Sequence, residues 1–201
     1  MKTLSKLLTA TFLISVVSVT ATAVDHVVEV KKNSVTDSAG KQSHITTHSS
    51  KKVMKLAIKL VQLEDNQGLK YIGGIVNSTD LQPYLVEMSK LLEKDFPDYR
   101  ENQMRRDHGE FHMTLINPYE YKEVNQNEIK LGKVIDIDLV GLGRVTKGAQ
   151  QTYFVVVNSK VAQQQRKQLG LSVKDFHVTL GFKPNDIYGV SKGAESLIRE
   201  K

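Results

Sequence analysis

Phe111-His112-Met113-Thr114-Leu115 is the stretch that decides the fold, together with its near copy Phe176-His177-Val178-Thr179-Leu180. Each copy alternates apolar and polar residues, which is the pattern of a β-strand with one buried face. The apolar residues would then face a core, and His and Thr would point together to the opposite side. Two such strands side by side would present four polar side chains on one sheet surface. We interpret this quartet as the candidate catalytic site: His112, Thr114, His177 and Thr179.

The segments before the two copies repeat the same order of elements. A strand from Tyr71 leads to Asn77-Ser78, which are helix-capping residues, and a helix and a loop then precede the first copy. A strand from Tyr153 leads to Asn158-Ser159, again followed by a helix and a loop before the second copy. Chance could supply two His-x-Thr triplets, but not easily the same flanking architecture twice. The sequence therefore predicts an internal duplication.

Apolar periodicity predicts the remaining elements. Helices are expected from Leu81 to about Phe96-Pro97 and from Ser159 to Leu169, the second ending at Gly170. Charged residues around 105–109 indicate a loop, residues 117–121 and 144–151 indicate turns, and residues 186–193 a loop before a last short helix. Strands are expected over residues 54–63, 71–76, 134–142 and 153–157 and over the two motif copies.

The first 23 residues have the pattern of a secretory signal peptide. Two lysines, Lys2 and Lys6, precede an apolar run over residues 7–19, and Ala21-Thr22-Ala23 forms a small-residue cleavage site. The apolar run is shorter than the ~20 residues that a membrane span needs. We therefore expect cleavage near Ala23, export to the periplasm or the medium, and no stable insertion in a membrane.

Residues 24–52 are mostly polar and are expected to form an arm or linker, with the folded domain over residues 53–201. This arm contains a third His-x-Thr triplet, His44-Ile45-Thr46. No apolar residue precedes the triplet and polar residues follow it, so a strand here would have no face to bury. A His-x-Thr triplet alone is therefore weak evidence for a catalytic site, and we exclude His44 from the site.

Composition excludes several classes of function. The 201-residue chain has no cysteine, which rules out disulfides and a thiol nucleophile, and its net charge is +6. Without residues 1–23, which contain two lysines and no acidic residue, the charge falls to +4. Such a mild excess favours anionic ligands. No dense Arg/Lys run with interleaved aromatic residues occurs, so duplex DNA is not an expected partner, and we expect a monomer.

A metal site is the main alternative for the first motif. His108 and His112 are four residues apart, but Glu110 is misplaced relative to His-Glu-x-x-His. Gly109 also disfavours the helix that would align the two histidines. We expect neither a metal nor a cofactor. Two histidines with an ordinary pKa of ~6.5 can instead hold opposite protonation states near neutral pH. One can activate water while the other protonates a leaving oxygen, and the Thr hydroxyls can hold a phosphate between them.

The paired motifs resemble those of the 2H phosphoesterase superfamily, whose signature is two His-x-Thr/Ser motifs. The ending from His177 through Gly181-Phe182 to Asp186-Ile187-Tyr188-Gly189-Val190 is similar to its Swiss army knife, RNA-repair-like branch. The resemblance implies an α+β, bilobal, duplicated fold with two antiparallel sheets facing a central groove and helices outside. It also implies phosphodiesterase activity on 2′,3′-cyclic phosphates or 2′-5′ linkages in nucleotides or single-stranded RNA ends. His112 and His177 would be the acid/base pair, and Thr114 and Thr179 would hold the phosphate.

Three further residues are candidates for substrate binding. Tyr119 and Tyr188 follow the motif strands, where a base could stack on them, and Lys192 could meet a phosphate. Surface packing and a solvated lysine are the plain alternatives. Two other functions remain open: an exported module that binds nucleotides or RNA ends without turnover, and a ligase-like enzyme, for which no nucleotide-activating lysine motif is evident.

Overall fold

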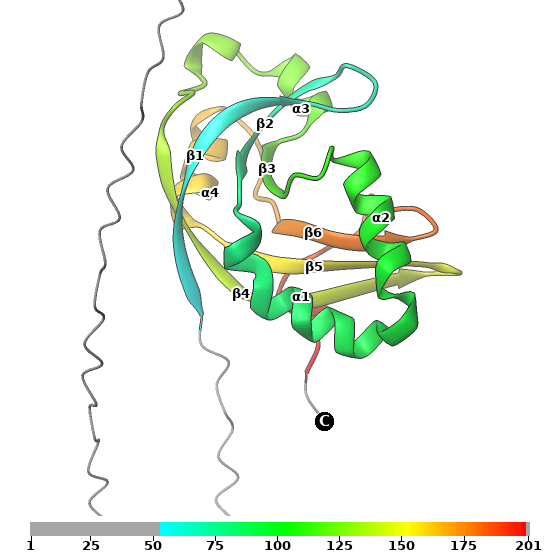
Figure 1. Ribbon diagram of the computed structural model, residues 1–201. Coiled ribbons are helices and arrows are strands. Elements are labelled where there is room, and N and C mark those ends of the chain that lie inside the picture. Colours follow the sequence, from blue (N-terminus) through cyan, green and yellow to red (C-terminus); the bar gives the residue numbers. More distant parts are fainter. Residues whose placement is uncertain (1–52, 200–201) are drawn as a thin grey trace, which may run out of the picture. The chain divides into compact units, whose positions relative to one another are not determined.

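The computed structural model describes residues 53–199, which form an α+β fold around six strands (Figure 1). The expected signal peptide, the expected polar arm and His44 lie outside the described residues. Residues 54–64 and 70–75 confirm the first two expected strands. The six strands are β1 (Met54–Glu64), β2 (Lys70–Ile75), β3 (His112–Ile116), β4 (Val134–Lys147), β5 (Gln150–Asn158) and β6 (Phe176–Lys183).

The strands pair antiparallel and close into a barrel in the order β1-β2-β3-β6-β5-β4. The two halves of the chain follow the same route. In each half a hairpin (β1-β2 or β4-β5) is followed by helical structure and by a third strand that pairs with the second. The halves join along two seams, where β3 pairs with β6 and β1 pairs with β4. Both motif strands therefore lie at one seam.

The expected arrangement of two separate sheets facing a groove is not what the structure has. Each half would leave an open edge at its first and third strands, and unpaired edges carry unsatisfied backbone groups. Pairing Met113 with Val178 closes one edge, and pairing Met54 to Lys59 with Leu139 to Val134 closes the other. A single closed sheet results.

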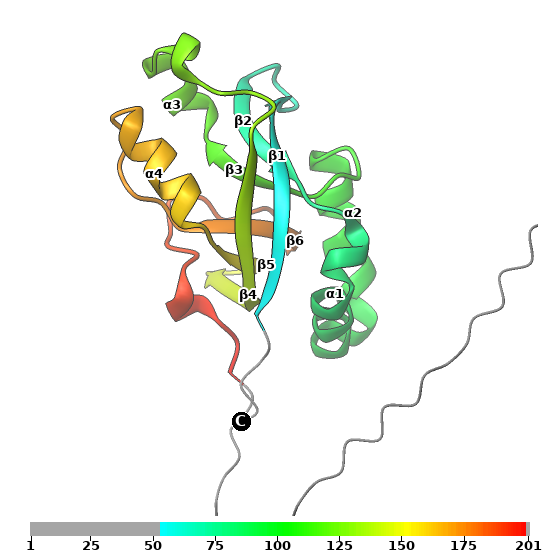
Figure 2. The same ribbon diagram turned by 90° about the vertical axis from the view of Figure 1, so that its left-hand side faces the viewer.

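Helices cover this sheet from two directions. Figure 2 shows β1 and β4 running down the middle, with α1 and α2 on one side and α3 and α4 on the other. Short 3-10 turns occupy Glu93–Asp95, Gln126–Glu128 and Ala194–Ser196. The helices are α1 (Ser78–Leu92), α2 (Phe96–Arg106), α3 (Pro118–Glu123) and α4 (Lys160–Gln168).

Two helices replace segments that the sequence predicted to be irregular. Phe96-Pro97 was expected to end a helix, but it begins α2, because Pro97 occupies the first turn, where its missing N–H costs nothing. The expected turn at residues 117–121 is the start of α3. There the Asn117 side chain accepts hydrogen bonds from Tyr119 N and Glu120 N, and the Glu120 carboxylate accepts one from Asn117 N, forming a capping box.

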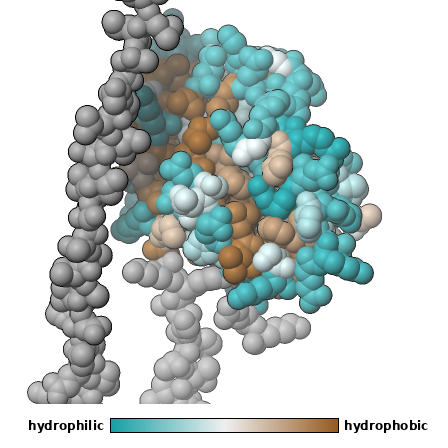
Figure 3. Space-filling view, in the orientation of Figure 1, coloured by the Kyte–Doolittle hydropathy of each residue, from teal (hydrophilic) through white to brown (hydrophobic). Residues whose placement is uncertain are grey.

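The main core lies on the apolar face of the strands, against α1, α2 and α4. Leu81, Met88 and Ala162 are fully buried there with the apolar residues of both motif strands. Some apolar side chains of α1 stay exposed, including Val86 and Leu91. Figure 3 shows hydrophobic and hydrophilic patches side by side on this face of the molecule. Across residues 53–199 we find no helix with the length and apolar character of a membrane span.

Candidate active site

The first motif strand shows the alternating burial that its sequence predicts, whereas the second shows it at His177 but not at Thr179, which is buried. Phe111, Met113 and Leu115 are buried in the main core, as are the matching residues of the second copy. His112, Thr114 and His177 are only half-buried and Thr179 is 8% exposed. None of these four belongs to the main core cluster. The structure therefore places the His and Thr side chains on the face opposite to it.

The pairing of β3 with β6 brings the two copies together. Met113 is the register partner of Val178, and the strands run antiparallel. The neighbouring residues then lie opposite each other, so that His112 is beside Thr179 and Thr114 is beside His177. The two histidines are diagonal neighbours, which in such a pair are roughly 7–8 Å apart. This spacing leaves room for a phosphate group between two imidazoles.

Equivalent arginines hold the two motif strands from the core side. Arg166 of α4 donates from Nη1 to the carbonyl of Leu115 at 2.7 Å, and Arg100 of α2 donates to the carbonyl of Leu180. Leu115 and Leu180 end the same motif in the two copies. Each half of the chain thus supplies an arginine that binds the motif strand of the other half. Because Arg166 also forms an ion pair with Glu120 at 2.7 Å, the first motif strand is tied to both α3 and α4.

His112 lies beside Tyr71 and close to carboxylates. The Tyr71 hydroxyl is 3.3 Å from His112 Nε2, and the two ring centroids are 5.5 Å apart. Burial lowers the pKa of His112; the Asp107 carboxylate acts in the opposite direction, and Arg106 and Glu110 have smaller effects of opposite sign. Burial raises the pKa of Tyr71 to about 12, helped by Asp107, so its hydroxyl keeps its proton. The imidazole is neutral near pH 7.

His177 has a different environment. Its ring meets the Phe154 ring edge-on with centroids 5.5 Å apart, and its buried Nδ1 has no hydrogen-bond partner among the described residues. Burial, and after it the ammonium of Lys192, lower the pKa of His177 to about 3, although the Asp186 carboxylate acts in the opposite direction. This imidazole is also neutral near pH 7, and its surroundings resist protonation strongly.

A buried network of charges connects the two environments. Lys192 is 4% exposed, and its Nζ lies 3.1 Å from Asp186 Oδ1. Asp186 also accepts from Thr152 Oγ1 at 2.9 Å and from Arg106. Arg106 binds Asp107 through Nε at 2.7 Å. Burial alone would raise the pKa of Asp186, but Lys192, Arg106 and Thr152 outweigh it and lower that pKa, so the carboxylate is charged.

The three predicted substrate-binding residues lie in different settings. Tyr188 is 70% exposed, with its hydroxyl 3.4 Å from Arg106 Nη1 and its ring centroid 6.0 Å from Lys192 Nζ. Tyr119 is 73% exposed in the first turn of α3. Lys192 is not the solvated lysine considered above, since Asp186 holds its ammonium in a buried site. Contact of any of the three with a substrate stays a prediction.

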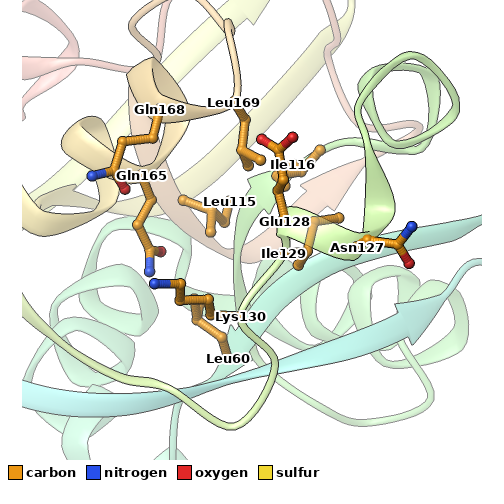
Figure 4. Close-up of a pocket in the computed structure, with 10 residues that line it drawn as sticks. All are labelled: Leu60, Leu115, Ile116, Asn127, Glu128, Ile129, Lys130, Gln165, Gln168 and Leu169. Atoms are coloured by element: carbon orange, nitrogen blue, oxygen red, sulfur yellow. The ribbon is translucent and has the colours of Figure 1, made fainter.

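Two cavities among the described residues are not lined by any residue of the quartet. The smaller one, ≈ 290 Å³, lies behind β3 on the core side, where Leu115 and Ile116 meet α4 and the 3-10 turn at Gln126–Glu128 (Figure 4). The larger one, a groove of ≈ 1170 Å³, is lined by neighbours of His177 but not by His177 itself. Val156, the register partner of His177 on β5, and Asp175, two residues before it, both line this groove.

Sequence patterns pointed to the quartet but missed the residues around it. The sequence predicts only the local structure of these residues: the start of a strand at Tyr71, a loop at Arg106 and a tail at Asp186. The sequence signal for Asp186 was its place in the Asp186-Ile187-Tyr188-Gly189-Val190 ending, which is similar to the Swiss army knife branch. Within residues 53–199 no group of three or more His, Asp and Glu side chains converges to hold a metal ion.

The sequence of this site matches a known family. The model of the 2H phosphoesterase domain of the Swiss Army Knife type matches residues 78–188, more than half of the chain. The chain is a 2H phosphoesterase. The match begins at α1 and ends at Tyr188, so it includes all four residues of the quartet but neither Tyr71 nor Lys192. No curated protein and no solved structure matches the chain.

Membership in this family establishes the general activity. A 2H phosphoesterase hydrolyses phosphodiester bonds, and two neutral imidazoles flanked by hydroxyls suit that chemistry because they supply proton transfer and hydrogen bonds to phosphate oxygens. Neither Thr114 nor Thr179 uses its hydroxyl in a hydrogen bond to another described side chain. Both hydroxyls are therefore available to a ligand in the phosphoesterase.

Proposed function

We propose that this phosphoesterase is a metal-independent phosphodiesterase that hydrolyses 2′,3′-cyclic phosphates or 2′-5′ linkages of nucleotides or short RNA ends. The observation that carries the proposal is the diagonal placement of His112 and His177 across one antiparallel strand pair, each opposite a threonine of the other copy. A phosphate between the imidazoles would meet a base on one side and an acid on the other.

The reaction needs only water and the quartet. One neutral imidazole removes a proton from water as the water oxygen forms its bond to phosphorus. The bond from phosphorus to one ribose oxygen breaks, and the other histidine, now protonated, gives its proton to that oxygen. Burial keeps both imidazoles neutral in the free chain, but an anionic phosphate favours the charged form of a neighbouring histidine. Substrate binding therefore supplies the condition under which one histidine carries a proton.

The groove beside His177 favours a small substrate over a long strand. Its charged lining consists of four carboxylates and three lysines. Affinity for a nucleic-acid backbone depends on neutralising phosphates with cations, and an excess of carboxylates opposes this. We therefore expect nucleotides and short ends to be better substrates than long RNA. The charged residues are Asp136, Asp138, Asp175, Glu195, Lys55, Lys160 and Lys174.

A substrate panel tests the proposal directly. The purified full chain is incubated, with chelator present, with 2′,3′-cyclic nucleotides, 2′-5′ dinucleotides, cyclic-phosphate-ended RNA of increasing length and 3′-5′ dinucleotides, and the products are identified. Turnover of the first two classes is expected, with rates falling as the RNA grows. Saturable binding without product across the panel would instead support the nucleotide-binding module.

The matched control for the motif histidines is His108. This exposed histidine lies four residues before His112, at a φ of 53° that asparagine tolerates. His108→Asn should keep full activity, while His112→Ala and His177→Ala should abolish it. Undiminished turnover in either motif variant would overturn the acid/base assignment.

A further inference from the structure

The two histidines of the quartet share a motif but not an electrostatic environment. We propose that Lys192, held by Asp186, is a positioning residue that makes His177 the general base and leaves His112 as the general acid. This inference rests on the phosphodiesterase function proposed above and adds the roles of the two histidines, which the motif alone leaves equivalent.

The His177 side carries a fixed cation. The buried Lys192 ammonium contacts Asp186 and lies near the Phe154 ring, with Nζ 5.6 Å from the ring centroid. The same Phe154 ring also contacts the ring of His177. Asp186 in turn is held by Thr152, Arg106 and the backbone N–H of Ile187 at 2.7 Å. Lysine side chains are rarely buried unless they are paired. The ion pair with Asp186, which is itself held by three groups, therefore fixes the position of the ammonium.

Three charged groups, Lys192, Asp186 and Lys174, act on the pKa of His177. Lys192 comes from the tail after β6, and Lys174 precedes β6; both disfavour an imidazolium. Asp186 favours it, but its charge is already shared with Lys192 and Arg106. Phe154 of β5 contributes no charge and excludes water. The sum of these contacts keeps His177 unprotonated, which is the state that a base needs.

The His112 side carries the opposite charge. Asp107 at the end of α2 receives hydrogen bonds from Arg106 and from Gln103 Nε2 at 2.9 Å, and Gln103 also binds the carbonyl of Glu110 at 2.8 Å. These bonds hold two carboxylate-bearing residues within five positions of His112. Asp107 and Glu110 favour an imidazolium at His112, Arg106 opposes it, and Tyr71 from β2 is uncharged. An anionic substrate phosphate would therefore favour protonation of His112 by solvent before that of His177.

These roles determine the path of each proton in the reaction. His177 takes the proton of the attacking water, His112 gives its proton to the departing ribose oxygen, and the new bond from water oxygen to phosphorus replaces the one that breaks. Both histidines then return to their starting states by exchange with solvent. The pH dependence of kcat/KM should accordingly have an acid limb set by His177 and a basic limb set by His112.

The test compares Lys192→Met, Lys192→Arg and Asp107→Asn in the full chain, using pH profiles of kcat/KM and NMR titration of both imidazoles without substrate. Lys192→Met should move the acid limb and the His177 titration upward by about one pH unit and leave the His112 titration in place. Lys192→Arg should restore the position of the acid limb. Asp107→Asn should move only the basic limb, downward. A loss of packing alone would lower activity without moving a titration.

Two results would overturn the proposal: an unchanged His177 titration in folded Lys192→Met, or a shift of the basic limb in that variant. If Lys192→Met does not fold, titration of the unsubstituted chain decides, because the proposal requires His177 to titrate below His112 and the reverse order refutes it. This titration needs no substrate, so it stands apart from the substrate panel. Failure of the panel would remove the proposed reaction but not the order of the two titrations.

Discussion

The two copies of the motif occupy equivalent places in the fold and unequal places in chemistry. Both strands bury the same apolar positions and both present His and Thr to one face. In both copies the motif ends in a leucine whose carbonyl an arginine of the other half binds. Yet His112 shares a hydrogen bond with Tyr71 next to carboxylates, whereas His177 packs on Phe154 next to a buried ammonium. The same route of the two half-chains explains the matching geometry, and the different surroundings are the basis of the different roles that we propose for the two histidines.

This difference comes from segments outside the repeated unit of strand, helix and strand. The second motif is followed by the tail that carries Asp186 and Lys192, whereas the first is followed by α3. The first is preceded by α2, which supplies Arg106, where the second half has only α4 and a loop. The predictions below test whether the two copies are as equivalent in geometry and as unequal in chemistry as the contacts indicate.

The largest expected effect comes from removing the histidines together. General acid–base catalysis by one positioned side chain contributes about 10²- to 10⁴-fold, so His112→Ala and His177→Ala should each lower kcat by that amount. Because the two act in one step, the double variant should be hardly worse than either single one. Steady-state kinetics on a cyclic nucleotide measures this. If the loss of kcat in the double variant equalled the product of the two single losses, the two histidines would act independently, and the proposal that they act in one step would be wrong.

The threonines test geometric equivalence. Each lies opposite the histidine of the other copy, so Thr114→Val and Thr179→Val should lower kcat by a similar factor, about 10² for one lost hydrogen bond to a charged transition state. Valine keeps the shape of the β-branched side chain, and Thr→Ser, which keeps the hydroxyl, should retain most activity at either position. A large loss at only one of the two positions would show that the phosphate is held by one copy alone.

The exposed tyrosines test whether the substrate base lies on the side of the second motif. Tyr188 lies next to Arg106 and Lys192, and Tyr119 has no such neighbours. Stacking of a base on an aromatic ring contributes about 1–3 kcal/mol. Tyr188→Ala should therefore raise KM about tenfold for a cyclic nucleotide at unchanged kcat, and Tyr188→Phe should not. Tyr119→Ala is the matched control with a smaller effect, and equal effects would contradict this placement of the base.

Local patterns predicted the parts of the site that depend on neighbouring residues. Alternation identified the buried and open faces of both motif strands, and Ser159 caps α4 as expected, accepting from Ala162 N at 3.1 Å. The sequence prediction of a helix end at Pro97 was wrong because proline is common both after the end of a helix and in its first turn. The sequence could not reveal barrel closure, since an alternating strand pairs equally well with several partners. The partnerships of Arg106 with Asp186 and of Tyr71 with His112 span 80 and 41 positions, and no local periodicity reports contacts at such separations.

The smallest expected effect, and the one that reports on His112 alone, comes from Tyr71→Phe. This change removes the hydroxyl that lies 3.3 Å from His112 Nε2 and keeps the ring. One hydrogen bond contributes about 1 kcal/mol, so kcat should fall roughly fivefold, and the basic limb of the pH profile should move while the acid limb stays. If the hydroxyl donates to neutral Nε2, its loss raises the pKa of His112; if it accepts from Nε2–H, its loss lowers that pKa. Movement of the acid limb instead would place Tyr71 beside the base and would reverse the roles assigned to the two motifs.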